Sequence, residues 1–139
     1  MKRSIIILVV LACLLSCVTS LGNWSDPQSV VEVWSRGFRE GQIRTVMSAY
    51  WSEATAAVID ASGREQNFTG NKEIKVLMKK LLENRAEGDQ VYLQVAELKS
   101  WSDVATCTLK IQTKSLQAAI LLELEKREGR WGIIRQVIK

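Results

Sequence analysis

Four consecutive strand-length segments form the last third of this 139-residue chain, and they constrain its fold more than any other feature. Each segment is long and rich in apolar and β-branched residues, which is typical of strands in a sheet. The segments are Val91–Leu98, Val104–Thr113, Leu116–Arg127 and Trp131–Ile138. Because the connections between them are short, we expect a strongly curved antiparallel sheet with helices covering one face.

The preceding part of the chain alternates helical and strand patterns. Ser25-Asp26-Pro27 has the composition of a helix start, and apolar residues follow at helical spacing until Gly41. The remaining predicted elements are a short helix over 43–51, strands over 55–60 and up to 69 with a turn at 60–63 between them, and a helix over 71–82 capped by Asn71. The sequence therefore predicts an α+β fold with the order α-α-β-β-α-β-β-β-β and three helices in the N-terminal half.

The first 17 residues have the parts of a bacterial export signal. Lys2 and Arg3 precede an apolar run of about 11 residues, which is long enough for a signal peptide and shorter than the ~20 residues that span a bilayer. The junction Leu14-Leu15-Ser16-Cys17 resembles the lipobox of bacterial lipoproteins. In that family the cysteine thiol is joined to diacylglycerol, and cleavage before it leaves the cysteine N-terminal.

This resemblance implies a lipoprotein-type signal peptide over 1–16, a lipidated tether over 17–24 and a folded domain over 25–139. The membrane partner would be reached through the lipid on Cys17. The expected location is the bacterial cell envelope, and Val18 after the cysteine favours the periplasmic face of the outer membrane in a Gram-negative organism. The alternative is an ordinary signal peptide cut after Ser20, with Cys17 incidental.

Charge and the remaining cysteines exclude several function classes. Removal of Lys2 and Arg3 with the leader lowers the net charge from +4 to +2, which gives no concentrated basic face for nucleic acid. Cys13 would leave with the leader, so Cys107 has no disulfide partner in the domain, and its alternation with apolar residues indicates a small buried hydrophobe. The chain has no histidine and no recognisable metal or cofactor motif, so we expect neither a metal nor a cofactor.

The order of elements resembles the nuclear transport factor 2-like (NTF2-like) superfamily, which includes SnoaL-like polyketide cyclases and ketosteroid isomerases. The matching motifs fall in order over residues 26–138: Val31–Gly41, Val46–Trp51, Val58–Gly63 with Gly70–Ile74, and Gly129–Ile134. The resemblance implies a cone in which the sheet wraps the helices around an apolar pocket, and a homodimer formed through the sheet. Because this cone hosts enzymes, carriers and interaction modules, the fold alone does not decide the function.

The chain has few of the catalytic residues that a ketosteroid isomerase uses. The resemblance places a general base at the end of the first strand, where Asp60 is a weak candidate. It places a tyrosine near Trp34 and a second acid near Ile120–Leu122, and neither is present. Asp60 has an alternative role as the first residue of a turn with Gly63 in fourth place. The acids Glu53, Glu123 and Glu125 are more typical of solvated positions than of a catalytic pair.

Several large side chains, most of them aromatic, are candidates for lining a binding pocket. Five large side chains from the predicted helices and strands are candidates to line the cone: Trp34, Tyr50, Trp51, Phe68 and Met78. Aromatic side chains in a concave site bind apolar ligands, but the same residues equally serve to fill the core of a small domain.

These observations leave three hypotheses for the domain. The leading one is a non-catalytic, envelope-anchored lipoprotein that binds a small apolar ligand in the cone or a protein partner on the sheet face. The second is a SnoaL-like enzyme with Asp60 as general base and an aromatic hydroxyl such as Tyr50 as donor. The third is a structural dimer module. The direction in which Asp60 points separates the second hypothesis from the others.

Overall fold

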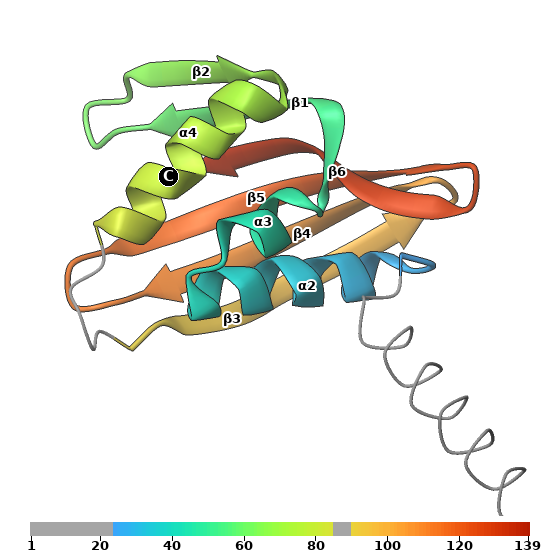
Figure 1. Ribbon diagram of the computed structural model, residues 1–139, viewed down its shortest axis with the longest axis horizontal. Coiled ribbons are helices and arrows are strands. Elements are labelled where there is room, and N and C mark those ends of the chain that lie inside the picture. The colour runs from blue at the N-terminus through green and yellow to red at the C-terminus, as the bar shows by residue number, and fades with distance from the viewer. Residues whose placement is uncertain (1–23, 85–89) are drawn as a thin grey trace, which may run out of the picture.

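The computed structural model describes residues 24–84 and 90–139, so the predicted signal peptide, Cys17 and most of the tether lie outside the described residues. The elements are α2 (Pro27–Glu40), α3 (Ile43–Met47), β1 (Tyr50–Ile59), β2 (Glu65–Thr69), α4 (Gly70–Glu83), β3 (Tyr92–Trp101), β4 (Val104–Gln112), β5 (Gln117–Arg127) and β6 (Arg130–Ile138). Their order confirms the predicted one. The three helices lie against one face of a curved sheet (Figure 1).

Helix α2 begins and ends as its sequence predicts. The Asp26 carboxylate accepts a hydrogen bond of 2.9 Å from the backbone N–H of Ser29, and Pro27 occupies the first helical position. Gly41 ends the helix with φ of 69°, a left-handed conformation that favours glycine. A Cβ atom on Gly37 would lie 2.8 Å from the backbone nitrogen of Val46, so this glycine allows α3 to pack directly on α2.

Helix α4 begins two residues earlier than a cap at Asn71 would allow, so that prediction is wrong. Thr69 is the residue before the helix, and its side chain makes no capping hydrogen bond. The Glu73 carboxylate instead accepts the backbone N–H of Thr69 at 2.6 Å, which places a negative charge at the positive end of the helix dipole. The inward-facing residues Ile74, Leu77 and Met78 are buried, as the helical spacing predicted.

The six strands form one sheet in the order β2-β1-β6-β5-β4-β3. All neighbouring pairs are antiparallel except β1 and β6, which run parallel because the last strand returns to lie beside the first. The register shifts between Val95 and Glu97 and between Glu123 and Leu124. Such bulges strengthen the local twist and help the sheet to curve around the helices.

Strand β1 begins at Tyr50, so the prediction that Tyr50 and Trp51 share one face of a helix is wrong. Adjacent residues of a strand point to opposite faces of the sheet. Tyr50 therefore points toward the helices, and Trp51 points away from them. Tyr50 and Trp51 therefore cannot line the same pocket inside the cone.

The core lies between the helices and the inner face of the sheet. Inner residues alternate along the late strands, and Ile120, Leu122 and Leu124 of β5 are fully buried. Cys107 of β4 is buried among them, which confirms its predicted role as a small hydrophobe. Burial also raises the pKa of the Cys107 thiol to about 11, so the thiol stays protonated and unreactive.

Candidate functional site

Three of the five predicted pocket residues meet inside the cone, in a chain of hydrogen bonds that also contains Gln136. The Trp34 indole donates to the Tyr50 hydroxyl at 2.8 Å, and that hydroxyl donates to the side-chain oxygen of Gln136. The Gln136 amide nitrogen then donates to the sulfur of Met78 at 3.5 Å. Each polar atom in this chain of contacts has a partner, as buried polar groups require.

The burial of these four hydrogen-bonded side chains decides whether they can contact a ligand. Trp34, Met78 and Gln136 have 0% of their surface exposed, and Tyr50 has 6%. A side chain without accessible surface does not border a space that holds water, so Trp34 and Met78 fill the core where they lie. Burial also raises the pKa of Tyr50 far above its usual range, so this hydroxyl does not ionise.

The other two candidates lie elsewhere. Trp51 projects from the opposite face of β1, where its indole donates to the backbone oxygen of Glu125 at 3.0 Å and its ring packs over Gly132. Phe68 lies on the short strand β2 opposite Ala56 and packs half-buried against the edge of the core. The five residues therefore do not form one site.

Trp51 belongs to a cluster of cations and aromatic rings on the outer face. The guanidinium of Arg127 lies 5.0 Å from the Trp51 ring centre, and that of Arg130 lies 4.9 Å from the ring of Trp24 and 5.5 Å from that of Trp51. These distances are within the range of cation–π attraction. The cluster attaches the first described residue of the chain to the end of the sheet.

Asp60 points out of the cone into the turn between β1 and β2. One carboxylate oxygen accepts the backbone N–H groups of Ser62 and Arg64, both at 2.9 Å, and the hydroxyl of Ser62 at 2.5 Å. The side chain is 52% exposed, and these hydrogen bonds, that of the Ser62 side chain foremost, lower its pKa. A general base that works near neutral pH needs a raised pKa, so the turn role explains Asp60 and the catalytic role does not.

The remaining candidate acids are neutralised by arginines on the outer face. Glu123 pairs with Arg135 at 3.2 Å. Arg127 pairs with both Glu53 and Glu125, and its hydrogen bond is the main cause of the lowered pKa of Glu53. Within residues 24–84 and 90–139, no group of three or more His, Cys, Asp or Glu side chains is placed to hold a metal ion. In the same ranges, no helix is long and apolar enough to cross a membrane.

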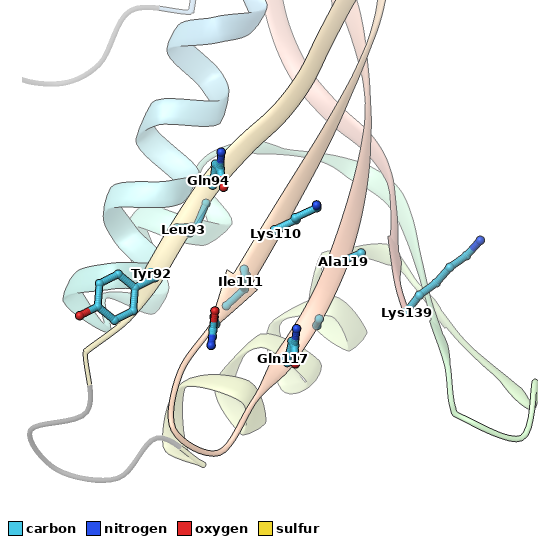
Figure 2. Close-up of a pocket in the computed structure, with 10 residues that line it drawn as sticks. Tyr92, Leu93, Gln94, Lys110, Ile111, Gln117, Ala119 and Lys139 are labelled. Atoms are coloured by element: carbon cyan, nitrogen blue, oxygen red, sulfur yellow. The ribbon is translucent and has the colours of Figure 1, made fainter.

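A ligand-sized hollow lies on the outer face of the sheet, over β3, β4, β5 and the end of β6 (Figure 2). Its volume is about 530 Å³. The strand register arranges its polar side chains in two cross-strand rows, and hydrogen bonds between Ala119 and Lys139 extend the second row. The first row is Tyr92, Gln112 and Gln117, and the second is Gln94, Lys110, Ala119 and Lys139.

A second hollow of about 400 Å³ adjoins the first and shares Ala119 and Lys139 with it. Its lining is mainly apolar: Ile59, Ile120, Leu121 and Val137, together with Thr108 and Arg135. We name the two hollows together the sheet groove. Sequence reasoning missed the sheet groove because its rows depend on the register of strands that are far apart in the chain.

Gln136 was also missed, for a related reason. When apolar and polar residues alternate regularly along a strand, the sequence predicts that an amide at an apolar position points into the core. A bulge in β6 breaks that alternation in the sequence, because Glu123 pairs with Arg135 whereas the next residue, Leu124, pairs with Ile133.

The comparisons with known proteins identify the architecture. No protein-family model and no curated protein matches the chain. An NTF2-like protein of unknown function from Methylobacillus flagellatus is 16% identical with a TM-score of 0.66, and the match covers 80% of this chain and 86% of that one. One from Pseudomonas putida is 13% identical with a TM-score of 0.65 and covers 84% of each chain.

A de novo designed protein with a curved β-sheet is also similar, with 11% identity, a TM-score of 0.62 and coverage of 81% of this chain and 98% of the design. A shape shared with a design carries no implication of activity, and identities this low establish the fold alone. The chain has the NTF2-like fold.

Proposed function

We propose that this chain is an envelope-anchored lipoprotein whose NTF2-like domain binds a partner without catalysing a reaction, and that the binding surface is the sheet groove. One observation carries the proposal. The predicted pocket residues Trp34, Tyr50 and Met78 are buried in a hydrogen-bonded network with Gln136, whereas ligand-sized hollows lie on the outer face of the sheet. This arrangement favours a partner on the sheet over an apolar ligand in the cone.

The position of Asp60 supports a non-catalytic role. The competing enzyme hypothesis needs Asp60 and Tyr50 to face one substrate, but the first lies in an exposed turn and the second is buried and hydrogen-bonded. If the protein taken from its envelope turned over a substrate and Asp60→Asn abolished that turnover, the non-catalytic proposal would fail.

The anchor part of the proposal rests on the sequence of the leader. Lys2, Arg3, the apolar run and Ser16-Cys17 together favour lipidation at Cys17. The Cys17→Ser variant should leave the membrane fraction or accumulate as an unprocessed precursor. Unchanged membrane partition with an unchanged mass would contradict lipidation.

The binding surface is tested by photo-crosslinking in the native envelope. We would place p-benzoylphenylalanine at Gln94, on the outer face of β3, in the full chain. The matched control replaces Gln28, an exposed glutamine on α2 on the helical side of the domain. A crosslinked partner at Gln94 and none at Gln28 is the expected result, and the reverse pattern would move the binding surface to the helices.

A homodimer through the sheet is a second candidate, favoured by one observation. Trp101 and Val104 are 54% and 50% exposed, and they lie opposite each other across β3 and β4. Exposed apolar pairs of this kind are typical of surfaces that become covered. Native mass spectrometry of the full chain should give a dimer that Trp101→Ser weakens if this candidate is right, and a monomer for both forms if it is not.

A further inference from the structure

We infer that the sheet groove binds an acidic peptide segment, with a carboxylate between Lys110 and Lys139 and a neighbouring apolar side chain in the second hollow. This inference deepens the proposed function and rests on it, because it names the chemistry of a partner for the same surface. The charge, the shape and the hydrogen-bonding groups of the sheet groove support it.

Several cations on and around the outer face of the sheet are paired with acidic side chains. Four of these cations have a carboxylate partner within the domain: Lys99 with Glu97 at 3.0 Å, Arg135 with Glu123, Arg127 with Glu125 and Glu53, and Arg64 with Asp60. Lys110 and Lys139 have no such partner among the described residues, and no acidic side chain lines the first hollow. The main-chain oxygen of Lys139, the last residue of the structure, accepts the N–H of Ala119 at 3.0 Å, so the two ammonium groups face at most one main-chain carboxylate in this hollow. The remaining positive charge favours an anionic occupant.

The register brings these two lysines within reach of a single acid. Lys110 and Lys139 flank Ala119 on neighbouring strands, so their backbones are on the order of 10 Å apart, which is two strand spacings. Ala119 is small, and it leaves open space between the two long side chains. In Figure 2 the Lys110 side chain extends toward β5, whereas the Lys139 side chain extends away from Lys110. Lys139 is exposed, so a rotamer change suffices to bring its ammonium group to the acid.

The rest of the lining favours a peptide as the carrier of the acid. Gln94, Gln112 and Gln117 each offer an N–H donor and a carbonyl acceptor, the same pair of groups that a peptide backbone presents. The second hollow is lined by the apolar side chains of Ile59, Leu121 and Val137, and it shares Ala119 and Lys139 with the first. An acidic residue followed by an apolar one matches both halves of the sheet groove.

The test titrates the full chain, isotopically labelled in an uncharged detergent, with the blocked peptide acetyl-Glu-Leu-amide. Its neutral isostere acetyl-Gln-Leu-amide is the comparison, and the backbone amide shifts of Ala119 and Lys139 are the readout. We expect the Glu peptide to bind about fivefold tighter than the Gln peptide, because an exposed charge contact contributes up to about 1 kcal/mol. Lys110→Gln should remove most of that preference.

The matched control is Lys99→Gln, which deletes the same charge from the same face at a lysine that already has a carboxylate partner. It should keep the preference for the Glu peptide. Leu121→Ser should weaken both peptides equally, since it alters only the apolar hollow. Circular dichroism of each variant establishes that it is folded.

Several results would overturn the inference. Equal binding of the Glu and Gln peptides, or no saturable shift with either, contradicts the carboxylate site. Loss of the preference in Lys99→Gln shows that net charge rather than the sheet groove is responsible. Displacement of the Glu peptide by an equal concentration of inorganic phosphate assigns the site to phosphate instead. A missing crosslink at Gln94 contradicts the proposed function, whereas these titration results contradict the peptide chemistry.

Discussion

The replacement Tyr50→Phe tests directly whether the interior of the cone is filled. The substitution removes one hydroxyl oxygen and creates no larger cavity. It leaves the Trp34 indole without its acceptor and the Gln136 side-chain oxygen without its donor, and both groups are fully buried. Each of these two buried polar groups costs roughly 1–3 kcal/mol when it loses its partner, so the free energy of unfolding should fall by about 2–6 kcal/mol.

Urea unfolding of the full chain in uncharged detergent, followed by circular dichroism, measures this loss. With a denaturant dependence of about 2 kcal/mol per molar urea, the middle of the usual range, the midpoint should fall by about 1–3 M. Tyr92→Phe is the matched control, because Tyr92 is 65% exposed and, among the described residues, its hydroxyl donates to the exposed side chain of Gln90 at 2.8 Å. Removal of such a surface hydroxyl should change stability by less than about 0.5 kcal/mol.

A Tyr50→Phe variant as stable as Tyr92→Phe would refute the reasoning. It would mean that water reaches the Trp34 indole and replaces the lost hydroxyl. A hydrated space would then exist beside Trp34 and Met78, and the hypothesis of a ligand inside the cone would regain its physical basis.

Three further predictions concern packing, reactivity and pH. Gly37→Ala should destabilise the domain by roughly 1–3 kcal/mol in thermal unfolding, despite the better helix propensity of alanine, because the added Cβ meets the backbone of Val46; unchanged stability would show that α3 shifts freely. Cys107 should react with a thiol reagent only after unfolding, as judged against Cys107→Ser, and fast labelling of the native protein would contradict its burial. Because its pKa is lowered in the folded state, the charged Asp60 stabilises its turn above the unfolded pKa of about 4 and loses this effect as pH falls through the folded value. Asp60→Ala should therefore cost more stability at pH 7 than at pH 3, and an equal cost at both would remove the charge from the explanation.

The order of elements could be predicted because each long segment has a clear periodicity. Ile120, Leu122 and Leu124 alternate as a half-buried strand requires, and Asp26-Pro27 is a local signal that needs no tertiary information. Tyr50 and Trp51 were misassigned because a short apolar run fits both a helix end and a strand start. The parallel pairing of β1 with β6 joins residues about eighty positions apart and leaves no local trace.

The candidate site was harder to predict for the same reason. A pocket inside the cone was expected from the character of single residues, but their packing depends on which strand brings Gln136 to Tyr50. The sheet groove depends on three strands that align Lys110, Ala119 and Lys139, and none of these residues is distinctive in its own segment. Local chemistry therefore predicted the turn role of Asp60 correctly as one of two alternatives, and it carried no information about the sheet groove.

A dimer that covers the sheet groove and an acidic peptide bound in that groove exclude each other, and electrostatics favours the peptide. In a two-fold dimer the same patch of both subunits forms the interface, so a dimer built over the sheet groove would bring the unpaired Lys110 and Lys139 near their copies. The excess positive charge of the two copies would oppose such contact, whereas an acidic peptide would neutralise part of it. A dimer through Trp101 and Val104 avoids this repulsion only if its two-fold axis lies near the turn between β3 and β4. Such a dimer leaves the sheet groove open. The acidic Glu peptide should accordingly leave a dimer of that kind intact and dissociate one that covers Ala119, and native mass spectrometry with and without the peptide distinguishes the two.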